Sequence, residues 1–176
     1  MMKTEKCFTK KTISVLRLSL MIGAVGFAPL AYSATASGPM SVSATVSSSC
    51  IVGTSTLAFG SATSAAIIAG NIDATGTVSV NCTSGSTYSV ALDAGAGTGA
   101  TIPIRKMSAG AQLLSYTVYS DTGRTTIWGN GTLASVPVAG TGTGTVQSIS
   151  AYGRIFAGQN VTAAAYADTI NVTITY

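Results

Sequence analysis

The chain has 176 residues, 9 of them basic and 5 acidic, and it contains no histidine. Without histidine, neither a Ser–His–Asp nor a Cys–His catalytic arrangement can form. Glu5 lies in the N-terminal leader, and the other acids are isolated in sequence, so an acid–base pair would need distant aspartates. We therefore expect no enzyme, no catalytic residue and no cofactor; the four remaining acids are Asp73, Asp93, Asp121 and Asp168.

The first 33 residues have the pattern of a cleavable secretory signal. Five basic residues precede an apolar run over residues 18–30, and Ala31-Tyr32-Ser33 then places small residues at the −3 and −1 positions. A membrane anchor is the alternative, but this run is shorter than the roughly 20 residues that span a bilayer. We expect cleavage near Ser33, with Ala36 as another site.

Removing residues 1–33 changes both the charge and the cysteine content. It leaves 9 − 5 = 4 basic and 5 − 1 = 4 acidic residues, so the formal net charge falls from +4 to zero. The basic balance is thus no argument for a nucleic-acid partner, and the few charges indicate a surface that tolerates association. Cys7 is removed, and Cys50 and Cys82 form an even pair that predicts one disulfide. Two cysteines without histidine would make a poor metal site.

The composition of the remaining chain predicts one all-β domain. Thr, Ser, Ala, Val and Gly dominate, whereas the helix formers Glu, Lys and Gln are scarce. Over residues 39–50, apolar residues alternate with Ser and Thr, which is typical of a strand with one buried face. The apolar positions of this strand are Met40, Val42, Ala44 and Val46.

Further alternating rows predict a series of short strands. We expect a short strand over residues 56–60, a loop or irregular edge over 61–70, a hairpin over 77–93, and strands over 114–119, 146–156 and 168–176. Asn130-Gly131 favours a hairpin turn. The glycine-rich stretches 95–99 and 140–144 are expected to be loops, because neither is followed by the residues that a nucleotide site requires. Strands at this spacing indicate a β-sandwich.

Two groups of side chains leave alternatives open. Asp121 could ligate calcium, but a single carboxylate more commonly caps a turn. The aromatic residues could form a sugar-binding platform, although core packing is the more frequent fate of such side chains. They are Tyr116, Tyr119, Trp128 and Tyr152.

Several motifs together resemble the spore coat protein U domain, which is carried by pilins of the archaic chaperone–usher pathway. The resemblance covers nearly all of the chain after the leader. The motifs are Cys50, Leu114-x-Tyr116-x-Val118-Tyr119-x-Asp121, Arg124-Thr125, Trp128-Gly129-x-Gly131, Tyr152-Gly153-Arg154-Ile155 and Tyr166-x-Asp168-Thr169-x-x-Val172-Thr173-Ile174-x-Tyr176.

The resemblance implies an incomplete immunoglobulin-like β-sandwich that lacks its last strand. A periplasmic chaperone would lend a strand, and at an outer-membrane usher the N-terminal extension of the next subunit would replace it. The product would be a fimbrium on the surface of a Gram-negative bacterium, used for adhesion and biofilm formation. The implied regions are a signal over residues 1–33, a donor-strand extension over 34–49 and a pilin domain over 50–176.

The resemblance also assigns residues to these roles. The donor strand would present Met40, Val42, Ala44 and Val46, and the acceptor groove would be lined by Ile170, Val172, Ile174 and Tyr176. Cys50 and Cys82 would form the disulfide of the fold. Expected partners are the chaperone, the usher and other copies of this chain or related subunits, with neither nucleic acid nor a small-molecule cofactor.

Other interpretations remain at this point. The chain could be a self-contained secreted carbohydrate-binding module, or a coat or matrix protein. The strand over residues 39–50 could also be an ordinary first strand that pairs within its own sheet. Within the pilin interpretation, a donor segment on a solitary domain favours a shaft or connector subunit over a tip.

Overall fold

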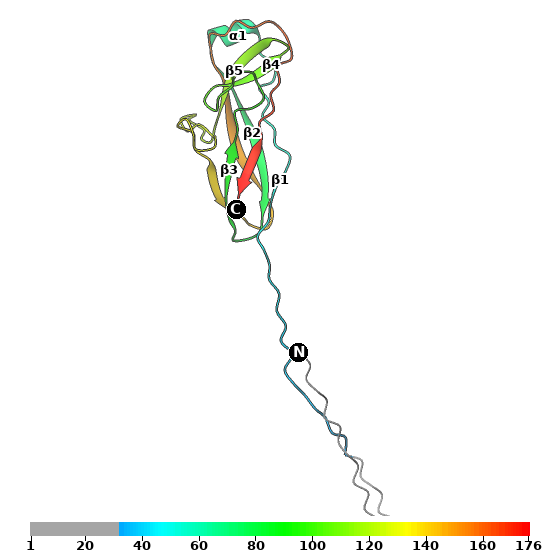
Figure 1. Ribbon diagram of the computed structural model, residues 1–176. Coiled ribbons are helices and arrows are strands. Elements are labelled where there is room, and N and C mark those ends of the chain that lie inside the picture. The colour runs from blue at the N-terminus through cyan, green and yellow to red at the C-terminus, as the bar shows by residue number, and fades with distance from the viewer. Residues whose placement is uncertain (1–31) are drawn as a thin grey trace, which may run out of the picture. The chain divides into compact units, whose positions relative to one another are not determined.

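The computed structural model describes residues 32–176 (Figure 1). Most of the expected signal, together with Cys7, lies outside the described residues. Taken by itself, the segment 32–43 has exposed side chains and no regular secondary structure. Residues 44–176 form a separate compact unit. No helix in the described part of the chain is long and apolar enough to cross a membrane.

The compact unit is built from short strands and one short helix, which confirms the all-β prediction. The strands alternate buried and exposed side chains, as expected for sheets with one face in a core. The elements are β1 (Cys50–Val52), α1 (Ser64–Ala69), β2 (Ile72–Cys82), β3 (Thr87–Leu92), β4 (Arg105–Ala109), β5 (Gln112–Tyr119), β6 (Val138–Thr141), β7 (Val146–Ile155) and β8 (Val172–Thr175).

The strands form two antiparallel sheets with the topology of an immunoglobulin-like sandwich. One sheet has the order β1-β2-β7-β5-β4 and the other β6-β3-β8. In an immunoglobulin domain, strands A, B, E and D share one sheet, and C, F and G share the other. In chain order, β1, β2, β3, β5, β7 and β8 correspond to A, B, C, D, E and F. Within residues 32–176, no strand occupies the place of G beside β8.

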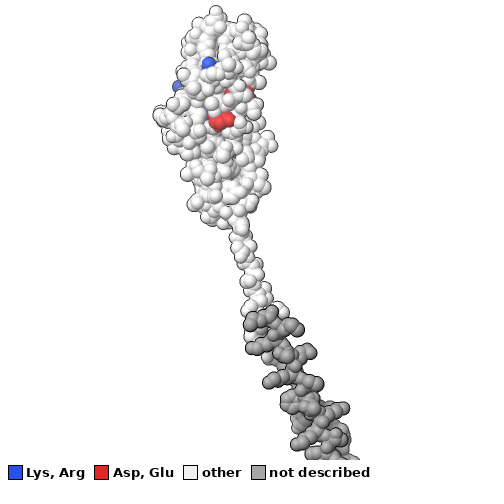
Figure 2. All heavy atoms as spheres, viewed as in Figure 1, with Lys and Arg blue, Asp and Glu red and all other residues white. Residues whose placement is uncertain are grey.

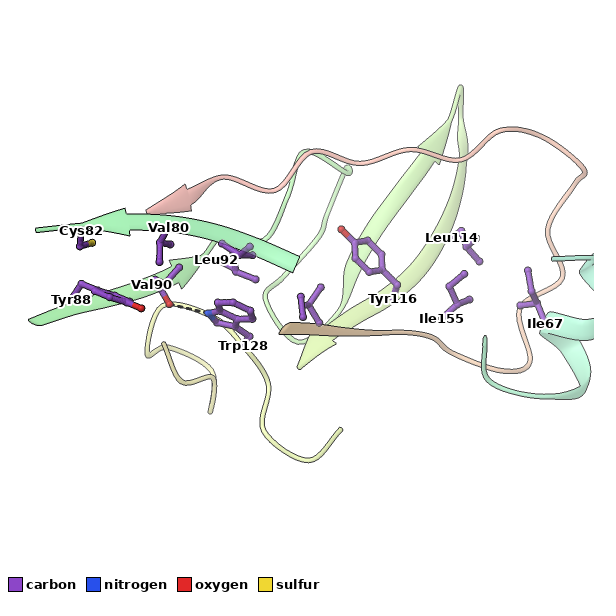
Figure 3. Close-up of a cluster of buried hydrophobic side chains, with 13 residues drawn as sticks. Ile67, Val80, Cys82, Tyr88, Val90, Leu92, Leu114, Tyr116, Trp128 and Ile155 are labelled. Atoms are coloured by element: carbon purple, nitrogen blue, oxygen red, sulfur yellow. Dashed lines mark hydrogen bonds between the residues drawn. The ribbon is translucent and has the colours of Figure 1, made fainter. Parts of the chain in front are cut away.

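The core lies between the inner faces of the two sheets (Figure 3). The predicted inward rows are confirmed on β5, whose Leu114, Tyr116 and Val118 are buried, and on β7, which buries Ala151 and Ile155. Trp128, from the connection between β5 and β6, is fully buried and donates a hydrogen bond from Nε1 to the carbonyl oxygen of Val90 at 2.9 Å. This bond satisfies the one polar atom of the indole ring.

The hairpin predicted over residues 77–93 is wrong. β2 and β3 belong to different sheets, and the connection after Cys82 crosses from one sheet to the other. Both strands have buried inward rows, which face each other across the core rather than lying side by side. A tight turn and two alternating strands are common to a hairpin and to such a crossing, so the sequence pattern does not distinguish them.

The loop predicted over residues 61–70 contains the helix α1. Thr63 caps it by accepting a hydrogen bond from the backbone N–H of Ala66 at 3.2 Å, and the N–H of Gly70 bonds to the carbonyl of Ala66. The helix has six residues, too few to show a helical period in the sequence. Its one buried residue, Ile67, closes the end of the core.

The hairpin predicted at Asn130-Gly131 is also wrong. The Asn130 side chain accepts hydrogen bonds from the backbone N–H and the hydroxyl of Thr132, which forms a local turn. The flanking residues make only isolated bridges, Tyr119–Ile127 and Trp128–Val136. Here burial of Trp128 determines the path of the loop.

A fully buried cation, Arg105, holds the β3–β4 and β5–β6 connections together. The guanidinium of Arg105 donates hydrogen bonds to the carbonyl oxygens of Asp93, Ile102 and Trp128, at 2.9, 3.0 and 2.8 Å. Burial lowers the pKa of Arg105, and the neighbouring Tyr116, Asp93 and Asp168 oppose that shift.

We expect Arg105→Met to lower the free energy of unfolding by about 3 kcal/mol, because the carbonyl oxygens of two buried residues and one half-buried residue lose their donors. Denaturant unfolding of the purified chain measures the change. Lys106→Met is the matched control, since Lys106 is only half-buried, and its effect should stay within about 0.5 kcal/mol. Equal losses in both variants would contradict the assigned role of Arg105.

Candidate functional site

An open groove of about 1130 Å³ runs along the sandwich next to the place of strand G, which no strand of residues 32–176 occupies. One wall is formed by residues 55–64, which follow β1, and the other by residues 161–170, which lead into β8. The floor is the apolar core itself. Its lining side chains are Ile67, Val78, Leu92, Met107, Leu114, Tyr116, Val118, Ala151, Ile155 and Val172.

Both walls carry backbone groups without backbone partners. Within the described residues, the backbone of residues 57–62 and 161–166 makes no hydrogen bond with another backbone group. The first wall is joined to β2 by one bridge, Thr56–Thr77, and the second to β4 by one bridge, Ser108–Ala167. Two walls whose N–H and C=O groups lack backbone partners, above an apolar floor, can bind an added β-strand.

The second wall is tied to the floor through a buried tyrosine. The Asp168 carboxylate accepts a hydrogen bond from the Tyr116 hydroxyl at 2.7 Å and one from the backbone N–H of Ala96 at 2.8 Å. Burial raises the pKa of Tyr116, and so does the bond to Asp168. Tyr116 therefore remains protonated and keeps donating to Asp168.

A second carboxylate holds the start of β8. Asp93 accepts hydrogen bonds from the backbone N–H groups of Gly95 and Asn171, both at 2.9 Å, and from the Asn171 amide at 2.6 Å. Burial of the carboxyl opposes its charged form, but these hydrogen bonds outweigh burial and hold the pKa of Asp93 below its usual value. Asp93 therefore stabilises the folded wall as a carboxylate.

The lowered pKa of Asp93 predicts a loss of stability in acid. Because its folded pKa lies below the unfolded value of about 4, its contribution is complete above that value and is lost as the pH falls through the folded pKa. We expect Asp93→Asn to be less stable than the parent at pH 7 and to lose less stability on acidification. Urea unfolding at a series of pH values tests this, and parallel profiles for the two proteins would contradict it.

The structure contains the predicted disulfide between Cys50 and Cys82. These residues are also cross-strand partners in the β1–β2 pair. β1 has only three residues, and Ile51 and Val52 are exposed, so little apolar burial holds it in place. The first wall of the groove follows β1 directly, and the disulfide thus fixes the point from which that wall begins.

The predicted donor residues are exposed in this chain. Met40, Val42 and Val46 have 83%, 85% and 86% of their surface accessible, and Ala44 is exposed too. Residues 40–49 form no strand. The alternative of an ordinary first strand paired within its own sheet is therefore not what the structure contains. The row remains available to another molecule.

The predicted acceptor residues have three different environments. Ile170 and Val172 line the groove, Ile174 packs against the core, and Tyr176 is 57% exposed. Sequence reasoning missed the opposite wall, in which Leu57 and Phe59 are half-buried. The alternation of these two residues was visible in the sequence, but not the groove they border.

The remaining candidate ligand sites are not formed in the structure. Asp121 caps a turn by accepting hydrogen bonds from the backbone N–H groups of Thr125 and Thr126. Tyr116 and Trp128 are buried, so the four aromatic residues make no exposed platform. Among residues 32–176, no three His, Cys, Asp or Glu side chains cluster in a way that could hold a metal ion.

The surface carries few charges. Figure 2 shows one face on which only a few Lys, Arg, Asp and Glu side chains are scattered among uncharged residues. One ion-paired group lies on the five-stranded sheet, where Arg154 contacts Asp73 at 2.7 Å and Arg124 approaches Asp73 at 3.4 Å. Charge therefore offers little to repel a second copy.

Comparison with known proteins identifies the family. A family model described as the Spore Coat Protein U domain matches residues 36–173. This chain belongs to the spore coat protein U domain family. It is also 33% identical over 176 residues to Protein U of Myxococcus xanthus, in an alignment that covers 93% of this chain and 97% of that protein.

The chain is also similar to solved structures, and the first of those named here shares its fold. One is the CsuC–CsuE chaperone–tip adhesion subunit pre-assembly complex from archaic chaperone–usher Csu pili of Acinetobacter baumannii, with a TM-score of 0.54 and 17% identity. That match covers 75% of this chain and 40% of the solved one. Another is the P pilus rod subunit PapA, with a TM-score of 0.47, 17% identity, and coverage of 72% and 98%.

Proposed function

We propose that this chain is a structural subunit of a chaperone–usher pilus and that it polymerises by donor-strand exchange. The observation that carries the proposal is the open groove at the position of strand G, with an apolar floor and unpaired backbone on both walls. The natural occupant is the exposed alternating row at residues 40–46 of a neighbouring copy or a related subunit. Membership of the spore coat protein U domain family and the fold shared with a chain of the CsuC–CsuE pilus complex agree with this role.

Strand addition would satisfy both needs of the groove. Backbone groups of the walls would pair with the added strand, and its apolar side chains would cover the floor. Four side chains, one of them only alanine, would contribute roughly 5–8 kcal/mol before the cost of ordering the segment. Because one copy donates and the next accepts, the contact is head-to-tail and does not close, so it builds a filament.

An unassembled subunit with this groove is an aggregation hazard. A periplasmic chaperone that lends a strand would remove the hazard, and an outer-membrane usher would exchange that strand for the next subunit's segment. The fibre would be an exported surface fimbrium that serves adhesion and biofilm formation. The role is structural, and no catalytic or cofactor chemistry belongs to it.

A coat protein is the second candidate, favoured by the family's description and by the protein U relative. It would use the same groove, with copies joined into a layer outside the cell rather than a chaperone-delivered fibre. Dependence on a chaperone separates the two proposals.

The test is to express the chain in a bacterial periplasm with and without the cognate chaperone and to run unboiled samples on a denaturing gel. The pilin proposal expects chaperone-dependent recovery and a ladder that collapses on boiling. Deletion of residues 34–47 should abolish the ladder while chaperone binding persists. A stable lone monomer that this deletion leaves unchanged would overturn the proposal.

A further inference from the structure

The first wall of the groove is seated on two glycines of the inner sheet face. A Cβ on Gly76 would collide with the carbonyl oxygen of Thr56, and a Cβ on Gly153 would lie 2.7 Å from Cζ of Phe59. Both contacts would be closer than the contacts that real Cβ atoms make. The wall around Phe59 therefore packs this closely against the sheet only because β2 and β7 carry glycine at positions 76 and 153.

Next to these glycines, the aromatic rings of Phe59 and Tyr116 occupy the groove. Phe59 is half-buried, and its ring meets that of Tyr116 edge-on, with centroids 5.9 Å apart and an interplanar angle of 74°. Tyr116 in turn donates its hydroxyl to Asp168 on the opposite wall. A chain of contacts thus crosses the groove from Phe59 through Tyr116 to Asp168 and fixes the position of the rings.

On either side of this crossing the floor is aliphatic. Figure 3 shows Tyr116 between Leu92 on one side and Leu114, Ile155 and Ile67 on the other, toward α1. All four aliphatic residues line the groove. Along its length, the groove therefore presents an aliphatic site, an aromatic crossing and a second aliphatic site.

The side chains of the donor row, which consists of Met40, Val42, Ala44 and Val46, have a matching pattern of sizes. Val42 and Val46 flank Ala44, the one small residue among its four apolar positions. A strand can slip by two residues without changing which face is buried, so only side-chain size distinguishes the registers. We propose, building on the proposed function, that Ala44 of the incoming strand lies over Phe59 and sets the register of donor-strand exchange. Val42 and Val46 then enter the aliphatic sites on either side.

Peptide exchange tests this register. The chaperone-bound chain is mixed with a peptide of residues 38–48, and native gels follow the replacement of the chaperone by the peptide. An Ala44→Leu peptide should exchange at least tenfold more slowly than the parent peptide. Phe59→Ala in the acceptor should remove most of that difference, since it deletes the opposing ring. The matched control, Val46→Leu, should exchange within threefold of the parent and gain nothing from Phe59→Ala.

Each outcome decides the proposal. If Ala44→Leu exchanges as fast as the parent peptide, or if Phe59→Ala does not relieve its defect, the register is overturned while strand exchange stands. If no peptide replaces the chaperone, the proposed function fails and the register with it. Should Phe59→Ala not fold, Phe59→Leu is used in its place and is expected to relieve the defect in part.

Discussion

Replacing both Cys50 and Cys82 with serine is expected to lower the free energy of unfolding by about 3–4 kcal/mol. The bridge joins residues 32 apart, and without it the unfolded chain regains the entropy that this loop had lost. Such a loss is a large fraction of the 5–15 kcal/mol that is typical of a domain. Denaturant unfolding of the purified double variant and its parent measures it.

The reductant response separates loss of the disulfide from loss of the sulfur atoms. Adding dithiothreitol should bring the parent down to the stability of the double variant and should leave the variant unchanged. If the two proteins unfold at the same denaturant concentration under oxidising conditions, the disulfide does not contribute as expected.

The same variant should disturb the groove before the rest of the sandwich. β1 is short and exposed, and it leads directly into the wall formed by residues 55–64. Without the bridge, amide hydrogens of β1 should exchange with solvent sooner than those of β7, which pairs on both sides with β2 and β5. The disulfide therefore connects the stability of the fold to the shape of the binding site.

Alternation predicted the inner strands of this fold better than its edges: the strand predicted over residues 56–60 is only the isolated bridge at Thr56, and the one predicted over 168–176 is β8, Val172–Thr175. The rows on β5 and β7 were visible because inward residues recur every second position and burial on one face selects them. The cysteine pair was predictable because only two cysteines remain after the leader. These features need no knowledge of which strands are neighbours.

The parts that failed depend on long-range contacts. Whether the turn after Cys82 makes a hairpin or crosses between sheets is decided by what packs against Tyr88 and Val90, far away in the sequence. The hairpin predicted at Asn130-Gly131 does not form, because the nearby Trp128 is buried and donates a hydrogen bond to the carbonyl oxygen of Val90. The buried Arg105 likewise has only backbone carbonyls as hydrogen-bond partners, and carbonyl groups carry no residue-specific signal.

The candidate site was half predictable for the same reason. Alternation marked the row at Ile170 and Val172, the family resemblance assigned it to an acceptor groove, and both residues line the open groove of the structure. The opposite wall was missed because the groove lies between residues 55–64 and 161–170, which are far apart in the sequence and are not joined by any strand of residues 32–176. Such a gap becomes visible only when the order of strands in both sheets is known.

Charging the donor row is expected to abolish assembly. On the proposed function, Val42 enters an apolar groove in the next copy, so Val42→Asp would bury a carboxylate without a partner, at a cost of several kcal/mol. We expect at least about a hundredfold less heat-labile ladder on unboiled gels, because each 1.4 kcal/mol corresponds to a factor of ten. Binding to the chaperone should persist, since Val42 is exposed and lies outside the sandwich of its own chain.

Ser43→Asp is the matched control for this charge. It places the same carboxylate one residue further along the segment, on the opposite face of the added strand, where it stays in water. The ladder formed by Ser43→Asp should therefore remain close to that of the parent. Equal loss in both variants would show that any negative charge in the segment blocks assembly and that burial of one face does not explain it. Loss of chaperone binding in Val42→Asp would instead place residue 42 in the fold of its own subunit.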